Sequence, residues 1–424
     1  MAVLDFPASP AIGDKYPTPA VAGQPQYTWD GEKWTTVGAQ VTTAAPASAL
    51  PLMDAATAVV GTATKYARED HVHPKIAAAP FDAMAYSGMQ VNGSFDVNQE
   101  RGVGVSIPGA GYVSDGNWWV TVAGPSVIAA KVNTHKTYFG GGLPQFLSIA
   151  VTTAEPSIAA GSRAAVQQNI EGYRIARLAW GTVNAQPMTI AFWTAHVRTG
   201  TYTGTVINAA GDRCYAFSYT QNVSNAAEYK TVTIPGCTNG VWADNNSVGL
   251  GISFAMASGS SGMAPSLNNW ISGTGYFAGP GQINGIAATT DAFYLTGVVV
   301  LPGSEAPSAA RSPLIMRPYD QELVTCQRYY QQLGGSVAND FGILSLYANA
   351  GGVQVSSAFT LPVEMRSAPT TGFGPGSWAI SNVTATNVFA GTRTAVLQAI
   401  STAAGMCFFY SDGPTKYLVL NARL

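Results

Sequence analysis

Two histidines separated by one residue are the side chains in this sequence whose spacing most directly predicts chemistry. His71 and His73 lie in the string GTATKYAREDHVHP, residues 61–74. In an extended strand, residues i and i+2 point to the same side, so both imidazoles could face one point. One chain would supply two ligands, whereas three parallel chains around an axis would supply six nitrogens. Six nitrogens suit an octahedral iron, nickel or zinc ion; the alternative is a solvated turn without metal.

Catalytic motifs are not recognisable in the sequence. A glycosidase needs two carboxylates at one bond, and acids are few here. Glu171 is the strongest candidate because it lies between β-prone segments, although we favour a carboxylate hydrogen-bonded to loop backbone. His135 and His196 are far apart and have no GxSxG-type motif nearby. There is no P-loop and no dinucleotide fingerprint. We therefore predict that the chain is not an enzyme.

Aromatic residues in polar, glycine-rich stretches give a better basis for function. Sugars present flat apolar faces and many hydroxyls, so their sites combine exposed rings with amide and hydroxyl groups. The stretch NNWISGTGYF fits this description best. The predicted sugar-binding residues are Trp119, Trp242, Trp270, Tyr276 and Phe277. Trp118 lies in a similar stretch, and for each ring singly the preferred alternative is packing in a core or an interface.

The composition of the chain excludes several classes of protein. With 424 residues it is long enough for two or more domains. Charged residues make up 10% of the chain, against about 25% in ordinary globular proteins, which is typical of repetitive β proteins and fibres. A net charge of −2 without a basic stripe predicts no nucleic-acid partner. Four scattered cysteines predict buried free thiols, with a contact between Cys214 and Cys237 as the alternative.

The first 80 residues predict an attachment segment followed by a linker. The amino terminus predicts no signal peptide, and no apolar run is long enough to span a membrane. In residues 1–36, Tyr27, Trp29 and Trp34 bracket the turn signal Asp30-Gly31, which predicts a hairpin. A lone hairpin is barely stable in water, so it needs a partner surface. Residues 37–80, rich in Ala, Thr and Pro, predict an extended linker that carries the histidine pair.

The remaining chain predicts an all-β protein with one helix. In residues 81–311, apolar residues alternate over several runs between polar loops, which predicts an antiparallel jelly-roll sandwich. Residues 312–335 predict a connecting helix with Pro318 near its start and Gly334 at its end. Its apolar stripe is Leu323, Cys326, Tyr330 and Leu333. Residues 336–424 return to short strands and predict a second sandwich or barrel, with an apolar last strand.

Several motifs, taken in order, resemble those of bacteriophage tail-fibre proteins. The opening pattern PASP...YTWDG...W and the string YAREDHVHP resemble segments of such fibres. The series VNGSFDVNQERG, DGNWW, QQNIEG, PMTIAFWTAHVRTGTYTGTV, EYKTVTIPG, GLGISFAMASGS and FYLTGVVVLPGSEAP is similar to the carbohydrate-binding-module-like jelly roll of phage tail fibres and covers about half of the chain. PY...EL..CQRYY resembles the string that often follows it. GVVVLPG departs from the Gln-Leu-Glu that relatives carry there, which puts any contact of those polar residues in doubt.

The resemblance implies a receptor-binding protein of the virion. It implies a parallel homotrimer that docks on a tail or baseplate protein through its amino terminus, with Tyr27, Trp29 and Trp34 as attachment residues. It further implies that the β domains bind host surface glycans, with the carboxy-terminal domain as a tip. His71 and His73 of three chains would hold a structural transition metal on the threefold axis. The alternatives are a tailspike-like depolymerase and a capsid decoration or head-fibre protein.

Overall fold

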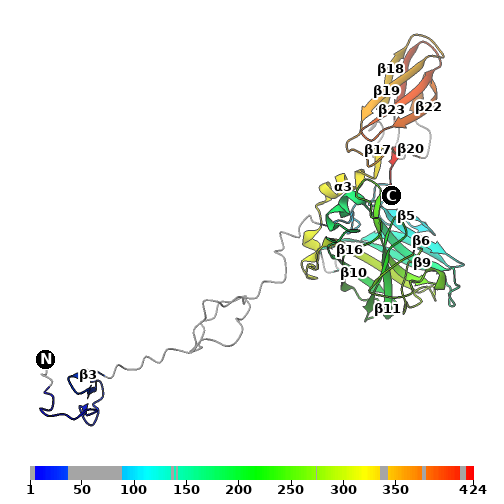
Figure 1. Ribbon diagram of the computed structural model, residues 1–424. Coiled ribbons are helices and arrows are strands. Elements are labelled where there is room, and N and C mark those ends of the chain that lie inside the picture. Colours follow the sequence, from blue (N-terminus) through cyan, green and yellow to red (C-terminus); the bar gives the residue numbers. More distant parts are fainter. Residues whose placement is uncertain are drawn as a thin grey trace. The chain divides into compact units, whose positions relative to one another are not determined.

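The protein is described by a computed structural model, shown in Figure 1. The structure describes residues 5–36, 88–134, 138–139, 142–273, 275–334, 342–374, 379–410 and 417–424. The chain divides into two units, Met1–Ile76 and Ala77–Leu424. The all-β prediction is confirmed, because the α-helices of the described residues are α2 (Gly172–Ile175) and α3 (Tyr319–Gln327) and almost everything else that is regular is strand. In this described part, no helix is long and apolar enough to cross a membrane.

The first unit is a three-stranded antiparallel sheet around an aromatic cluster. Its strands are β1 (Lys15–Tyr16), β2 (Tyr27–Trp29) and β3 (Trp34–Thr36), in that order. Trp29 pairs with Trp34 across the turn that the sequence predicts, and Asp30 Oδ1 accepts hydrogen bonds from two backbone N–H groups of that turn. Phe6 stacks on Trp34 at 5.1 Å and meets Tyr27 edge-on. These rings give the small sheet its own core.

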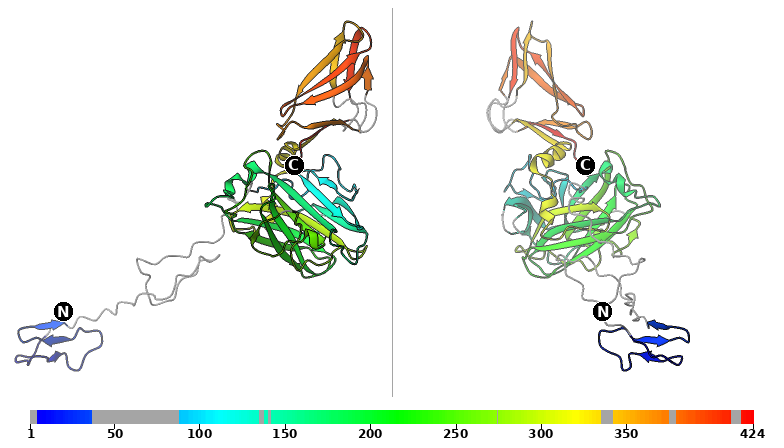
Figure 2. Two further views of the ribbon diagram at one scale, coloured as in Figure 1. Left: turned by 45° about the vertical axis from the view of Figure 1, so that its right-hand side comes forward. Right: turned by 90° about the vertical axis from the view of Figure 1, so that its left-hand side faces the viewer.

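The second unit contains a sandwich of two antiparallel sheets, seen as two layers in Figure 2. In spatial order, the six-stranded sheet is β13 (Glu228–Ile234), β10 (Met188–His196), β16 (Ala292–Pro302), β8 (Gln145–Thr153), β7 (Val127–Thr134) and β4 (Ile107–Pro108). The seven-stranded sheet is β15 (Trp270–Ile271), β12 (Cys214–Gln221), β11 (Gly200–Asn208), β14 (Val248–Ser258), β9 (Arg163–Glu171), β6 (Trp118–Ala123) and β5 (Gly111–Ser114). Alternate residues such as Ile190 and Phe192 of β10 and Ile252 and Phe254 of β14 meet in one core.

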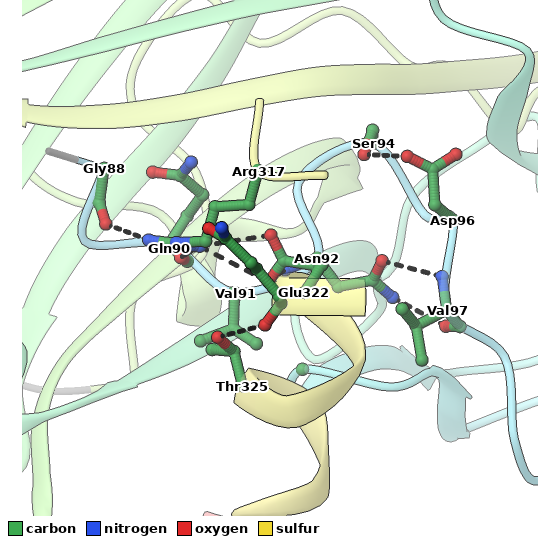
Figure 3. A network of polar contacts seen from close by, with 12 residues as sticks. Gly88, Gln90, Val91, Asn92, Ser94, Asp96, Val97, Arg317, Glu322 and Thr325 are labelled. Carbon is green, nitrogen blue, oxygen red and sulfur yellow. Dashed lines mark hydrogen bonds and ion pairs between the residues drawn. The ribbon is translucent and has the colours of Figure 1, made fainter. Parts of the chain in front are cut away.

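A buried polar network joins the start of the sandwich to α3 (Figure 3). Asn92 holds its own loop closed, because its side chain donates to the Val97 carbonyl at 2.7 Å and accepts from the Val97 N–H at 3.0 Å. Its backbone N–H donates to Glu322 Oε1 at 2.8 Å. Arg317 pairs with Glu322 and donates to the carbonyls of Gly88 and Gln90. Each buried polar group shown here has a partner, as a stable interior requires.

The predicted helix over residues 312–335 is wrong in length. The structure has the 3₁₀ turn η3 (Ser312–Ile315), then α3, and then the strand β17 (Tyr330–Gly334). Asp320 and Glu322 lie in the first turn of α3, where acidic side chains suit the helix dipole. Tyr330 and Leu333 instead lie on β17, which pairs with β25 (Tyr417–Asn421). Helical spacing over a short apolar stretch cannot reveal a strand partner so far along the chain.

The carboxy-terminal domain consists of three small antiparallel sheets. In spatial order they are β17, β25 and β20 (Thr370–Phe373); β18 (Gly342–Ala348), β24 (Gly405–Tyr410) and β21 (Ala379–Ser381); and β19 (Gln354–Thr360), β23 (Thr394–Ser401) and β22 (Val383–Ala390). Leu418 and Leu420 are fully buried, so the apolar last strand packs in the core as predicted. Arg366 donates to the carbonyls of Ala422, Arg423 and Asn246. The bond to Asn246 ties the domain to the sandwich.

All four cysteines are buried free thiols, as predicted. Burial raises the pKa of the Cys214 thiol to about 12, and it also raises the pKa of Cys237. A thiol held protonated in an apolar setting packs as a small hydrophobe and is a poor nucleophile or metal ligand. The cysteines therefore contribute to the cores and not to a reactive site.

Candidate functional site

Three tryptophans meet at one end of the sandwich. Trp180 follows η1 (Ala176–Leu178), Trp242 lies in the loop between β13 and β14, and Trp270 begins β15. The ring centroids of Trp180 and Trp242 are 4.6 Å apart, those of Trp180 and Trp270 are 5.2 Å apart, and those of Trp242 and Trp270 are 5.6 Å apart. All three pairs meet edge to face, the arrangement that aromatic quadrupoles favour. We call these residues the tryptophan cluster.

Backbone hydrogen bonds fix the orientation of each indole in the cluster. Trp180 Nε1 donates to the Gln186 carbonyl at 2.7 Å. Trp242 Nε1 donates to the Asn239 carbonyl at 3.0 Å, and Trp270 Nε1 donates to the Pro235 carbonyl at 2.9 Å. Because every indole N–H is already used, these rings offer a ligand only their apolar surfaces. Trp180 is buried, whereas Trp242 and Trp270 are half-buried and keep part of that surface open.

Glycines allow the loops under Trp242 to approach closely. Gly181 has φ +84°, and a Cβ there would lie 2.8 Å from the Gly240 carbonyl oxygen and 3.3 Å from the Trp242 ring. Gly240 has φ +86° and also lies in the left-handed region, which other residues rarely adopt. Any side chain at Gly181 would push the two loops apart and tilt Trp242. The local sequence therefore positions the ring.

Two pockets flank the tryptophan cluster. The larger, which we call the tryptophan pocket, has a volume of about 460 Å³. It is lined by Ile175, Ala176, Ala179, Trp180, Gly181, Thr182, Gly240, Val241, Trp242, Ala243 and Asp244. The smaller pocket, of about 240 Å³, has Trp270 beside the polar side chains of Arg213, Asn239 and Ser272. The tryptophan pocket falls in the size range of small-ligand sites, roughly 300–1,000 Å³.

The predicted sugar-binding residues separate into two groups. Trp242 and Trp270 belong to the tryptophan cluster. Trp119 is half-buried on the outer face of the seven-stranded sheet, 4.8 Å from the Tyr112 ring and directly opposite Gln167. The carbonyls of Tyr276 and Phe277 accept hydrogen bonds from Thr205 and Ser253, which lie in the same cross-strand row as Gln167. The cavity beside Tyr276 and Phe277 measures only about 10 Å³. This cavity is too small to enclose a sugar ring.

Trp118 and His196 are core residues. Trp118 is fully buried beside Phe95, and its Nε1 donates to the backbone carbonyls of Val91 and Asn92. His196 is fully buried between Tyr202 and Phe293, with ring centroids at 3.5 Å and 4.5 Å. Its Nε2 lies 3.2 Å from the Tyr219 hydroxyl. Burial, aided by the charge of Lys230, lowers the pKa of His196 well below its ordinary value, so the ring stays neutral.

Glu171 is a structural residue, but its predicted partners are wrong. Its side chain is 2% exposed, and it accepts hydrogen bonds from Arg328 Nη2 at 2.6 Å, Arg328 Nε at 2.8 Å and Tyr329 Oη at 2.7 Å. Burial acts to raise the pKa of this carboxyl, but hydrogen bonds from Arg328 and Tyr329 outweigh it and lower the pKa. The partners are side chains that follow α3 and not loop backbone, because the chain returns to the end of β9 after more than 150 residues.

The remaining predicted residues are structural or lie outside the described residues. Tyr27, Trp29 and Trp34 are half-buried in the aromatic cluster of the first unit. Their role in attachment stays a prediction. His71, His73 and His135 fall outside the described residues. In the part of the chain that is described, no three His, Cys, Asp or Glu side chains gather as metal ligands.

Trp180 is the site residue that sequence reasoning missed. It occurs in LAWGT, after a run that looks like ordinary core, and is in fact 6% exposed. The available signal was the glycine that follows it, because both Trp180-Gly181 and Gly240-Val241-Trp242 combine indole and glycine in polar loops. Their convergence depends on strand order, which sequence alone does not give.

Comparison with known proteins leaves the family of this chain open. No family model and no curated protein matches it. Among solved structures, the enzymatically active domain of tailspike protein 4 of bacteriophage CBA120 aligns over 51% of this chain and 22% of that one, with 9% identity and a TM-score of 0.27. The family 11 carbohydrate-binding module from Clostridium thermocellum, in complex with a β-1,3-1,4-mixed-linked tetrasaccharide, aligns over 47% and 98%, with 14% identity and a TM-score of 0.24.

A xylan-binding domain from Paenibacillus barcinonensis, CBM22-1, aligns over 47% of this chain and 95% of that one, with 13% identity and a TM-score of 0.20. TM-scores of this size lie far below the values of proteins that share an overall fold. Neither the fold nor the function of this chain is therefore inferred from these likenesses.

Proposed function

We propose that this chain is a glycan-binding protein whose sugar site is the tryptophan pocket. The observation that carries the proposal is Trp242, a half-buried ring held by its own N–H bond at the mouth of a pocket of about 460 Å³. The pocket places the exposed carboxylate of Asp244 and the exposed Thr182 beside this ring. A flat apolar surface with a carboxylate acceptor at its edge suits one face and the hydroxyls of a sugar.

Binding is better supported than cleavage. Glycoside hydrolysis generally uses two carboxyl groups on either side of the scissile bond. Asp244 is the one carboxylate among the described residues that line the tryptophan pocket. Glu171 is engaged by Arg328 and Tyr329, and it lines none of the pockets described above. We therefore do not propose a depolymerase.

The proposed biological setting is a homotrimeric bacteriophage tail fibre that adheres to host glycans. The support is the ordered set of motifs that resemble tail fibres, together with one surface of the carboxy-terminal domain. Tyr347 of β18 pairs with Met406 of β24, and Tyr410 lies on the same outer face. These side chains are 65%, 46% and 37% exposed. Exposed apolar groups gathered on one sheet face are typical of protein interfaces.

In this setting the amino-terminal unit would dock on a tail or baseplate protein, and the histidine pair would hold three chains in register through an axial metal ion. Size-exclusion chromatography with light scattering tests the assembly. We expect three times the 44.0 kDa mass of one chain. A monomer at working concentration contradicts both the trimer and the axial metal.

A glycan array followed by titration calorimetry tests the binding proposal. We expect Trp242→Ala and Asp244→Ala each to weaken the best array ligand by about tenfold or more, because a central aromatic contact is worth about 2 kcal/mol. Asp244→Ala changes an exposed residue, so a folding defect cannot account for its effect. The matched control is Trp119→Ala, which removes a half-buried tryptophan from the outer sheet face. A glycan whose binding depends on Trp119 and not on Trp242 contradicts the proposed site.

A further inference from the structure

A further pocket, about 330 Å³ in volume, is lined by three arginines. Arg174 and Arg177 come from α2 and η1, and Arg317 comes from the segment before α3. Tyr173, Gly88 and Met89 complete the lining, so no carboxylate lines the pocket among the described residues. We call this the arginine pocket.

Among the described residues, three arginines line this pocket and the two nearby acids are already paired. Glu322 is bound by Arg317, as Figure 3 shows, and Glu171 is bound by Arg328 and Tyr329. Among the described residues, the one hydrogen bond of Arg174 runs from Nε to the Tyr329 hydroxyl at 3.3 Å. Its two terminal nitrogens therefore still need acceptors.

The arginine pocket and the tryptophan pocket lie on two sides of the same short segment. Ile175, Ala176 and Ala179 line the tryptophan pocket. Tyr173, Arg174 and Arg177 line the arginine pocket. Neighbouring residues of this single helical segment thus line both pockets, which places the arginine pocket beside the proposed sugar site. Tyr173 is 62% exposed and offers an aromatic ring beside the guanidinium groups.

We propose that the arginine pocket binds an oxyanion carried by the glycan, a carboxylate or a phosphate group, so that the ligand of this protein is an acidic saccharide. The inference rests on the proposed function, because it extends the same binding surface. Guanidinium groups bind both oxyanions through paired, charge-assisted hydrogen bonds. Tyr173 would pack against the sugar ring that bears the anion.

Saturation-transfer proton NMR on the full chain tests the inference with small sugar probes, and phosphorus NMR follows the binding of inorganic phosphate. The probes are methyl α-galacturonoside, its neutral counterpart methyl α-galactoside, and inorganic phosphate, at one ionic strength. We expect the galacturonoside to bind about tenfold or more tightly than the galactoside and to be displaced by phosphate, since a hydrogen bond to a charged group is worth about 1.5–3 kcal/mol. Phosphate binding without galacturonoside binding would identify phosphate as the source of the oxyanion.

Arg177→Gln is the test variant, and Arg393→Gln is the matched control. Arg177 is exposed, so the fold should tolerate the change. Arg393 is a 74% exposed arginine of the carboxy-terminal domain and lies outside the arginine pocket. We expect Arg177→Gln to weaken the anionic probes about tenfold and Arg393→Gln to leave them unchanged. The inference is overturned if neither the galacturonoside nor phosphate binds. It is also overturned if the Arg177→Gln variant binds both probes with the affinity of the natural chain.

These outcomes are separable from those of the proposed function. Neutral glycans that bind through Trp242 without any anion preference would leave the proposed function intact and overturn the acidic ligand. Phosphate binding that depends on Arg177, with no glycan bound on the array, would overturn the proposed function and leave the pocket as an oxyanion site.

Discussion

Removing Arg328 should destabilise the protein in a manner that depends on pH. The variant Arg328→Met keeps a long aliphatic side chain at this position but removes the two hydrogen bonds that Arg328 donates to Glu171. The Glu171 side chain is 2% exposed, and among the described residues it would keep the Tyr329 hydroxyl as its direct partner at 2.7 Å, with Arg174 as a nearby charge. Leaving one member of a buried ion pair behind costs about 3–5 kcal/mol. We take about 3 kcal/mol because Tyr329 and Arg174 remain.

The expected shift in melting temperature follows from this free energy. At about 2–4 °C per kcal/mol for a domain of this size, Arg328→Met should melt about 6–12 °C below the natural chain at pH 7.5. Circular dichroism and tryptophan fluorescence report the transition of the sandwich. The control is Arg393→Gln, which breaks an exposed ion pair in the carboxy-terminal domain. It should shift the melting temperature by about 1 °C or less.

The pH dependence of this deficit identifies the mechanism. In the natural chain the pKa of Glu171 is lowered, so its pairing adds stability above the unfolded pKa of about 4.3 and that stability is lost as pH falls. In Arg328→Met burial dominates and raises the pKa, so the buried charge costs stability as pH rises. The deficit should therefore be largest at pH 7.5 and shrink towards pH 4.5. A deficit of about 1 °C at pH 7.5, or one that is equal at both pH values, refutes the reasoning.

Two further predictions concern histidines. The pKa of His196 is lowered well below its ordinary value, so the unfolded chain binds a proton below about pH 6.5 that the folded chain does not; stability should fall by about 1.4 kcal/mol per pH unit below that point. His196→Phe, measured by urea unfolding at pH 7.5 and pH 5, should lose this part of the slope, and an unchanged slope contradicts it. For His71 and His73, elemental analysis should find iron, nickel or zinc at about one ion per three chains, and the double alanine variant should lose the metal and melt at a lower temperature. A trimer that holds no metal, and whose stability does not change in the double alanine variant, would contradict the metal site and favour a turn without metal.

The sequence allowed the class of fold to be predicted because strand alternation is a local property. The runs in β10 and β14 place every second apolar side chain in the core, and that period is visible in the sequence. The hairpin turn at Asp30-Gly31 is equally local, since both paired strands lie within a few residues. The length of α3 could not be predicted, because Tyr330 is recruited to a strand that pairs with residues near the carboxy terminus.

The sequence indicated aromatic residues in polar loops as candidate binding residues, but it did not show which of them meet in space. Trp242 and Trp270 stand out as rings in polar loops, and both belong to the tryptophan cluster. Trp119, Tyr276 and Phe277 have the same sequence character, yet they lie at the outer sheet face and line neither of the two pockets beside the tryptophan cluster. What separates the groups is the sheet order that brings β15 beside β12, a contact over long sequence distance. The arginine pocket could not be predicted for the same reason, because Arg317 is about 140 residues from Arg174 along the chain.

Titration calorimetry with the best glycan-array ligand, comparing Trp242→Ala, Asp244→Ala and Trp119→Ala with the natural chain, is the most direct test of glycan binding at the tryptophan pocket. The account predicts an affinity lower by about tenfold or more for the first two variants and an unchanged affinity for the third. Binding that survives Trp242→Ala and Asp244→Ala but is lost in Trp119→Ala would contradict it.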